Sequence, residues 1–171
     1  MVRDFLGEHY MVLKSVHMLF AMIWVWSTSV AYISYVVPAF RNWLAHPDDQ
    51  DATQLRNWVM ERFDHGVILE HVAFPMLLIT GPMLMFSAGW GVDAGWLAAK
   101  LVFVVLIFIP IEIFDYWLAH FGGNKQALRE AGRMDDYEAY MHRHWWFLVI
   151  TTPVISIFAI GALFLAIIKP F

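Results

Sequence analysis

Four long stretches of mainly apolar residues follow one another along the chain, and the segments between them carry most of the charge. A helix needs about 20 such residues to cross the hydrocarbon core of a bilayer. Because every backbone polar group in lipid must be paired internally, the pattern predicts an all-α, integral membrane four-helix antiparallel bundle. The predicted spans are Tyr10–Val37, Val67–Phe86, Leu97–Leu118 and Trp145–Ile168.

The two long polar segments between the spans predict short surface helices in the loops. Residues 51–63 carry one apolar stripe at helical spacing, and Asp48, Asp49 and Asp51 lie around the N-terminus of this segment, where negative charge favours a helix. Residues 122–124, Gly-Gly-Asn, break the chain before a second polar helix at residues 125–142. The connection at residues 87–95 is short and rich in glycine. We therefore expect a single membrane domain over residues 1–171.

The composition agrees with a membrane protein and limits its chemistry. The chain is 60% hydrophobic, 17% aromatic and only 15% charged, whereas a soluble domain is about one-half apolar and one-quarter charged. These values exclude a disordered chain, a nucleic-acid-binding protein and a typical cytosolic enzyme. With no Cys, disulfides, thiolate nucleophiles and iron–sulfur clusters are excluded too. The chemistry must come from His, carboxylates, Lys or a bound cofactor.

Lys and Arg are unevenly divided between the two sides of the predicted bundle. Arg3, Lys14 and Lys169 lie on the side of the termini. By the positive-inside rule, the larger number on the other side predicts cytoplasmic long loops, with both termini outside, in a bacterial inner (cytoplasmic) membrane. The basic residues on the loop side are Arg41, Arg56, Arg62, Lys125, Arg129, Arg133 and Arg143.

The ionisable residues of the spans fall into two clusters, and polar groups at such positions are functional hypotheses by default. The outer cluster joins His17 in the first span and Lys100 in the third, at similar depth. For His17, a packing role and a role in ligation or proton transfer both stay open. Lys100 could also snorkel to the interface, as is preferred for Lys14 one turn nearer water.

The inner cluster lies near the loop side. Pro75 removes the hydrogen bond to the carbonyl of His71, which leaves that oxygen free beside a buried histidine. For His120, and for the run His142-Arg143-His144, an interfacial role is preferred over ligation. The members of the cluster are Asp64, His65, Glu70, His71, Glu112, Asp115, His142 and His144.

Two kinds of cofactor fit these clusters. Imidazoles from two helices can hold a haem, and His17 with His71 is the best pair, although helical rise puts them roughly 13 Å apart along the membrane normal. Alternatively, the inner cluster could bind hard, non-haem metal ions, although it lacks the Glu-x-x-His spacing of di-metal bundles. The weaker candidate metal ligands are Glu70, Glu112, Asp115 and His142.

Five short motifs occur in order over nearly the whole chain. They are Leu13-Lys14 with His17 and Trp24, Met60-Glu61-Arg62, Thr80-Gly81, Gly95-Trp96-Leu97 with Lys100-Leu101, and Lys169-Pro170-Phe171. In order and spacing they resemble the HemJ-type protoporphyrinogen IX oxidases. The chain departs from that family at Ala98-Ala99, at Thr151-Thr152-Pro153 and at Phe114-Asp115-Tyr116, where the family often has His, Asn-Glu before proline, and His respectively.

The resemblance implies a haem-b-containing membrane oxidase of haem (porphyrin) biosynthesis. It implies that His17 is the iron ligand and that Lys100 is functionally important, so these two are the predicted catalytic residues. His71 and Lys100 join His17 as predicted cofactor-binding residues. The released protons would move through Glu112 and Asp115. The expected partners are the lipid bilayer, a porphyrin substrate and a quinone or redox-partner protein.

Two alternatives to the haem-b oxidoreductase stay open. One is a metal-dependent membrane enzyme that uses the inner cluster of His and carboxylates. The other is a non-catalytic membrane subunit of a larger redox complex. A homo-oligomer is compatible with each of the three, and the substrate and the electron acceptor are not determined by the sequence.

Overall fold

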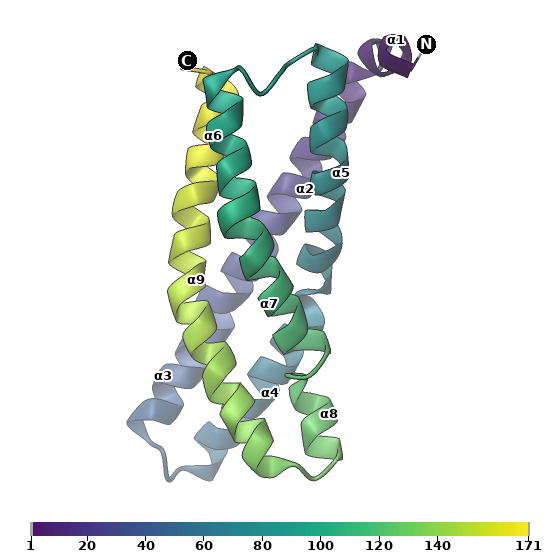
Figure 1. The fold of residues 1–171 in the computed structure, drawn as a ribbon. Helices are drawn as coiled ribbons and strands as arrows, with labels where there is room; N and C mark the ends of the chain where they lie inside the picture. Colours follow the sequence, from purple (N-terminus) through teal and green to yellow (C-terminus); the bar gives the residue numbers. More distant parts are fainter. Residues whose placement is uncertain (1, 171) are drawn as a thin grey trace.

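The computed structural model describes residues 2–170, with side chains from residue 5 onward, and no strand occurs in that range. Four antiparallel helical rods form the molecule (Figure 1). Each rod is long and apolar enough to cross a membrane. The predicted all-α four-helix membrane bundle is therefore confirmed.

The rods differ in how many helices they contain. The first consists of α2 (Tyr10–Ala31), the π-helical segment η1 (Tyr32–Val36) and α3 (Val37–Ala45), and the short helix α1 (Val2–Glu8) precedes it at an angle (Figure 1). The second consists of α4 (Gln50–Gly66) and α5 (Ile68–Ala88), and the fourth is the single helix α9 (Met134–Ile168). The third consists of α6 (Gly95–Phe103), the π-helical segment η2 (Val104–Phe108), α7 (Ile109–His120) and, after a turn, α8 (Lys125–Glu130). Both chain termini lie at one end, here called the terminal end, and the α3–α4 and α8–α9 turns lie at the other, the loop end (Figure 1).

The two π-helical segments each precede a proline that would otherwise break its rod. Pro38 follows η1 and Pro110 follows η2. A proline ring clashes with the carbonyl four residues earlier, and these carbonyls belong to Ser34 and Leu106, which lie inside the wider π turns. The widened turns therefore accommodate both prolines, and each rod continues as a helix beyond them.

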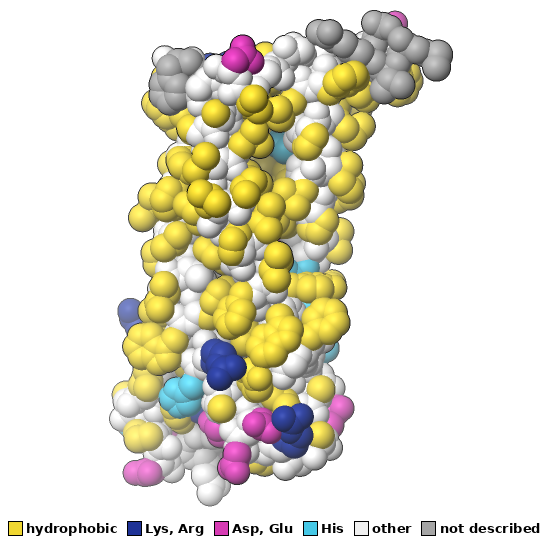
Figure 2. Space-filling model, in the orientation of Figure 1, with side chains coloured by type: hydrophobic (Ala, Val, Ile, Leu, Met, Phe, Trp, Pro, Cys, Tyr) yellow, Lys and Arg dark blue, Asp and Glu magenta, His cyan; other side chains and the backbone are white. Residues whose placement is uncertain are grey.

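At the loop end, all four rods contribute to a compact core. Phe40, Met60, Leu118 and Met141, from α3, α4, α7 and α9, are completely or almost completely buried. Charged side chains gather over this end, whereas apolar side chains cover most of the rest of the visible face (Figure 2). The polar segments predicted as surface helices are α4, α8 and the first turns of α9, which extend the rods because they bury one face in this core.

In the terminal half, the rods form two pairs, α2 with α5 and α6 with α9 (Figure 1). A smaller apolar cluster that includes Trp24, Phe74 and Phe108 connects the pairs near the middle of the molecule. Many large apolar side chains remain exposed here, among them Leu106 and Ile160. Such exposure is what contact with lipid requires, since hydrocarbon is the solvent of a spanning helix.

Candidate functional site

The polar side chains inside the bundle form two separate groups. We call the first the His17 site, which consists of His17, Thr80 and Lys100 in the terminal half. We call the second the buried network, which lies where the spans meet the loop end. Its members are Asp64, His71, Asp115, His120, Lys125 and His144.

In the His17 site, a threonine on the neighbouring helix holds the histidine ring. His17 Nδ1 lies 2.7 Å from Thr80 Oγ1, and the Thr80 hydroxyl donates to the Met76 carbonyl oxygen, also at 2.7 Å. Because that hydroxyl proton is already used, Thr80 Oγ1 accepts the proton of His17 Nδ1. This pairing assigns the lone pair to His17 Nε2, for which the described residues provide no hydrogen-bond partner.

The half-buried ring of His17 lies directly against α5. A Cβ atom added at Gly81 would lie 3.6 Å from His17 Cε1, in ordinary van der Waals contact. A side chain larger than that of alanine at position 81 would therefore press on the ring. Thr80 and Gly81 together fix both the tautomer and the position of the imidazole. A metal-ligating histidine is typically held in this way by a bond from its other ring nitrogen.

Lys100 on α6 completes the His17 site. It is half-buried and close enough to His17 for its charge to act on the ring. Among the described residues, no carboxylate forms an ion pair with it. An ammonium in apolar surroundings requires an anionic or polar partner. The site thus offers a nitrogen lone pair within electrostatic reach of a cation that forms no ion pair among the described residues.

Asp115 on α7 is the centre of the buried network. Its Oδ2 lies 3.2 Å from His71 Nε2 on α5, and its Oδ1 lies 3.1 Å from His144 Nε2 on α9. His71 Nδ1 lies 2.9 Å from His120 Nε2, so both ring nitrogens of His71 are engaged. The carboxylate therefore connects three helices through two imidazoles.

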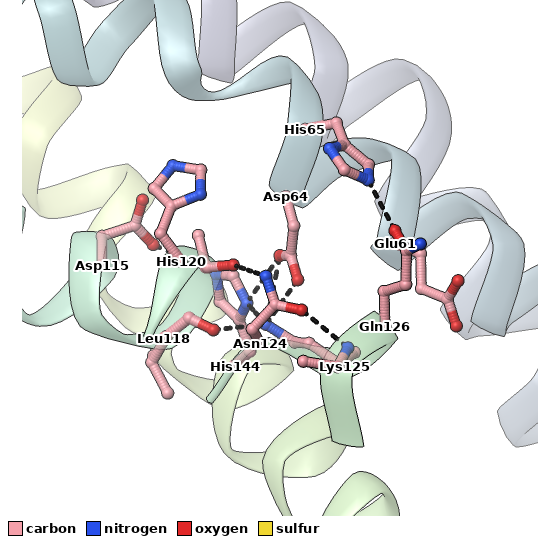
Figure 3. Close-up of polar contacts among 12 residues, drawn as sticks. Glu61, Asp64, His65, Asp115, Leu118, His120, Asn124, Lys125, Gln126 and His144 are labelled. Carbon is pink, nitrogen blue, oxygen red and sulfur yellow. Dashed lines mark hydrogen bonds and ion pairs between the residues drawn. The ribbon is translucent and has the colours of Figure 1, made fainter. Parts of the chain in front are cut away.

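Lys125 closes the other side of the network, although it lies in the polar segment before α9. Its ammonium donates to Asp64 Oδ1 and to the Leu118 carbonyl oxygen, each at 3.1 Å, and to His144 Nδ1. Figure 3 shows Asp64, Lys125 and His144 pointing toward one another from α4, α8 and α9. Because three acceptors meet three N–H groups, this completely buried cation is fully satisfied.

The turn between α7 and α8 places Lys125 in this interior position. A Cβ atom at Gly123 would lie 2.8 Å from both the Cα and the carbonyl oxygen of Leu118, so only glycine fits against that backbone. Asn124 then caps α8, and its Nδ2 donates to the Ala119 carbonyl oxygen at 2.9 Å. The chain consequently folds back under the end of α7 and carries Lys125 inward.

A pair of buried carboxyl groups lies between the two groups. Glu112 Oε1 accepts a hydrogen bond of 2.7 Å from Trp24 Nε1, and the carboxyl group of Glu70 interacts electrostatically with that of Glu112. Both glutamates are buried. This glutamate pair joins α5 and α7 in the middle of the bundle.

The structure brings together most of the predicted inner cluster but separates His71 from His17. Iron ligation by His71 would require that it give up its bond to Asp115 or to His120. We therefore retain only His17 as the candidate iron ligand. Among the described residues, no group of three or more His, Asp or Glu side chains is arranged to hold a metal ion.

Two histidines of the inner cluster lie outside the network. His142 is exposed, with its ring 5.3 Å from that of Trp43, whereas His144, two residues later, is completely buried. His65 is exposed and bonds to Gln126 at 2.8 Å. The interfacial role preferred for His142 agrees with its exposure, and the same preference was wrong for His144.

Two residues of these groups were not found by the sequence reasoning. Lys125 was counted only as a basic loop residue, although the Gly-Gly-Asn run before it is a signal for a chain that folds back. Thr80 was noted only as part of a motif. Nothing local to Thr80 indicates its contact with His17, because the two residues are 63 positions apart.

The fold and its apolar surface define an integral membrane four-helix bundle. Comparisons with protein-family models, with curated proteins and with solved structures found no match to this chain.

Proposed function

We propose that the chain is a haem-b-binding integral membrane oxidoreductase and that His17 is the iron ligand. The observation that supports this is a half-buried imidazole held at Nδ1 by Thr80, with no partner for Nε2 among the described residues and with the charge of Lys100 acting on the ring. When bound, haem supplies one-electron redox chemistry, and a single histidine is a common iron ligand. The apolar surroundings suit the porphyrin ring.

Each residue of the His17 site has a role in this proposal. His17 would hold the iron through Nε2, and Thr80 keeps the ring in the tautomer that leaves Nε2 unprotonated. Lys100 would bind the carboxylate of a propionate, either of haem or of a reduced porphyrin substrate. Oxidation of protoporphyrinogen IX, with a quinone or a redox-partner protein as the electron acceptor, follows from the resemblance to the HemJ-type enzymes.

The test is a visible spectrum of the detergent-purified protein, oxidised and then reduced with dithionite, after expression with ample haem. We expect a Soret band in the wild type and its loss in His17→Ala. His142→Ala is the matched control, because it removes an exposed histidine outside both groups and should retain haem. A wild-type protein without a Soret band, or His17→Ala with normal haem content, contradicts the proposal.

The alternative functions predict different results for the same sample. A metal-dependent enzyme would contain a non-haem metal by elemental analysis and show no Soret band. A non-catalytic subunit of a larger complex would be unstable or redox-inactive without its partners. The absence of a metal-holding cluster among the described residues gives the first alternative no support.

We also propose that the loop end is cytoplasmic in a bacterial inner membrane and that both termini are outside. The concentration of basic residues at the loop end supports this orientation. Since the chain has no Cys, single cysteines can be labelled without background. In intact cells, a membrane-impermeant maleimide should label Asp93→Cys in the α5–α6 connection but not Asp135→Cys at the loop end. The reverse result would invert the orientation.

A further inference from the structure

The glutamate pair defined above has a property that neither site explains. Glu70 and Glu112 are only 4% and 6% exposed, and their carboxyl groups interact electrostatically with each other. Two interacting carboxylates in a buried site would place two like charges away from water, which is costly. The burial of the pair therefore favours one bound proton.

The surroundings of the pair leave one oxygen available for that proton. Trp24 Nε1 occupies Glu112 Oε1 and fixes the orientation of that side chain. By contrast, Glu70 Oε2 is buried and receives no hydrogen bond from any donor among the described residues. A buried carboxyl oxygen without a donor is costly when charged, and protonation removes that cost.

The pair also lies between the His17 site and the buried network. Trp24, which holds Glu112, follows His17 by seven residues on α2, which is about two turns or roughly 10 Å along the same helical face. Glu112 and Asp115 are three residues apart on α7, and Glu70 precedes His71 on α5. The pair therefore lies one or two turns from each group.

From Asp115 the network provides steps toward the loop end. Asp115 bonds to His71, and His71 bonds to the half-buried His120. A neutral imidazole can accept a proton at one nitrogen and release one from the other, so a chain of such rings conducts protons. The charges facing the pair are those of Asp115 and His71, with His144 and Lys125 behind them.

We propose that the glutamate pair is a proton-holding site and that Asp115, His71 and His120 form the path by which its proton exchanges with water at the loop end. In one passage, Asp115 relays the proton of the pair to His71 Nε2, His71 passes a proton from Nδ1 to His120 Nε2, His120 releases one to water, and no electron moves. No direct hydrogen bond joins the pair to Asp115 or His71 among the described side chains, so the proposed path includes one bridging water molecule at this first step.

The proposed oxidoreductase gives the path its biological role, because oxidation of a reduced porphyrin at the His17 site would release protons about two turns away. Only that role rests on the proposed function. The bound proton and its exchange path follow from residues that do not ligate iron in that proposal, and they can be tested in protein without haem.

The experiment uses infrared spectroscopy of the full-length protein in detergent near neutral pH. A protonated carboxyl group has a C=O stretching band distinct from that of a carboxylate, and this band shifts when deuterium replaces the proton. We expect the wild type to show the band, and the double variant Glu70→Gln/Glu112→Gln to lose it. Glu8→Gln, at an exposed carboxyl group in α1, is the matched control and should retain it.

The path is tested by the rate at which the band shifts after rapid transfer into D2O. We expect Asp115→Asn and His120→Gln each to slow the shift at least tenfold, with unchanged exchange of backbone amides. His120→Gln keeps the test decisive if Asp115→Asn does not fold, because His120 is only half-buried. His142→Gln, outside the network, should exchange at the wild-type rate.

The outcomes separate this inference from the proposed function. Absence of the band in the wild type, or its persistence in the double variant, overturns the proton-holding site. Wild-type exchange rates in His120→Gln overturn the path. Loss of the Soret band in His17→Ala together with either result would retain the haem proposal and reject this one.

Discussion

His17 and His71 are both histidines on long apolar helices, and the structure treats them in opposite ways. Among the described residues, the His17 ring has one hydrogen-bond partner, Thr80, and Lys100, whose charge acts on the ring, forms no ion pair. Both nitrogens of His71 are engaged, by Asp115 and His120. The members of the buried network thus bond to one another, whereas the described residues leave His17 Nε2 available for the ligand proposed above.

The reason for this difference lies in the elements around each group. Helices α4, α5, α7, α8 and α9 converge on the buried network, above the compact core of the loop end. The His17 site lies where the helices form two pairs with exposed apolar surfaces. Convergence of many elements brings donors and acceptors together, and a pair of helices facing lipid leaves groups without partners.

We expect the largest loss of stability when one member of the buried network is removed. Lys125→Met leaves the Asp64 carboxylate buried without its cation, and removing one partner of a buried ion pair costs about 3–5 kcal/mol. The free energy of unfolding in detergent, followed by circular dichroism, measures the loss. Lys14→Met is the control, since Lys14 is exposed, and equal stability of the two variants would contradict this account.

Substitutions in the turn between α7 and α8, which places Lys125 in the interior, should lower stability almost as much. Gly123→Ala forces a Cβ atom against the Leu118 backbone, which cannot move aside as a side chain would, and such overpacking costs about 1–3 kcal/mol. Gly66→Ala is the matched control, because a Cβ atom there meets nothing within 4 Å. Thermal unfolding should separate the two variants, and the idea fails if Gly66→Ala is the more destabilising.

At the His17 site, loss of the threonine hydroxyl should affect ligand binding more than stability. Thr80→Val removes one hydrogen bond, worth about 1 kcal/mol, but frees the His17 ring to rotate. We expect lower haem retention through detergent washing, measured by the Soret absorbance per protein. Thr28→Val is the control, because Thr28 Oγ1 is buried without a partner and loses no bond. Equal retention in both variants would argue against positioning by Thr80.

The smallest effect is expected for an ion pair at the surface of the loop end, outside the apolar stretches. Burial would raise the pKa of Glu61, but the hydrogen bond and charge of Arg129, with the Tyr137 hydroxyl, hold this pKa below its ordinary value of 4.5. A carboxyl group whose pKa is lower in the folded than in the unfolded state stabilises the fold at pH values above its unfolded-state pKa. This stabilisation is lost as the pH falls through the folded-state pKa.

Accordingly, Glu61→Gln should lower the melting temperature slightly at pH 7, and the difference from wild type should vanish in acid. The effect should also shrink at high salt, unlike that of Lys125→Met, because Arg129 is exposed and screened by ions. A salt-independent loss as large as that of Lys125→Met would remove the distinction between the buried and the exposed pair.

The spans were predictable because lipid sets a minimum length for apolar helices, and residues 10–37 or 145–168 meet it without any tertiary information. The depth of Asp115 near the loop end was predictable for the same reason, whereas Glu112 lies nearer the middle of the bundle, where it bonds to Trp24. Which face a residue occupies was harder. His142 and His144 are two residues apart on α9, so they point to nearly opposite sides, and only the packing of α9 determines which one is buried.

The contacts that the buried polar side chains make with one another could not be predicted from the sequence. Lys125 is basic and lies in a polar segment, so its burial depends on Asp64 and His144 arriving from other elements. The contact between His17 and Thr80 likewise depends on how α2 and α5 pair. Length and hydropathy are properties of one segment, whereas charge compensation is a property of several segments at once.

The length of α9 has a practical consequence for imaging a protein of this size. Its 35 residues span about 52 Å, while the hydrocarbon core of a bilayer is about 30 Å thick. Roughly 20 Å of packed helix therefore stands clear of the lipid or detergent belt. The open turn around Gly132, where an added Cβ atom meets nothing within 4 Å, is the natural position for a rigid helical fusion or an antibody epitope. Such a fiducial would give electron cryomicroscopy a feature that the apolar spans alone do not provide.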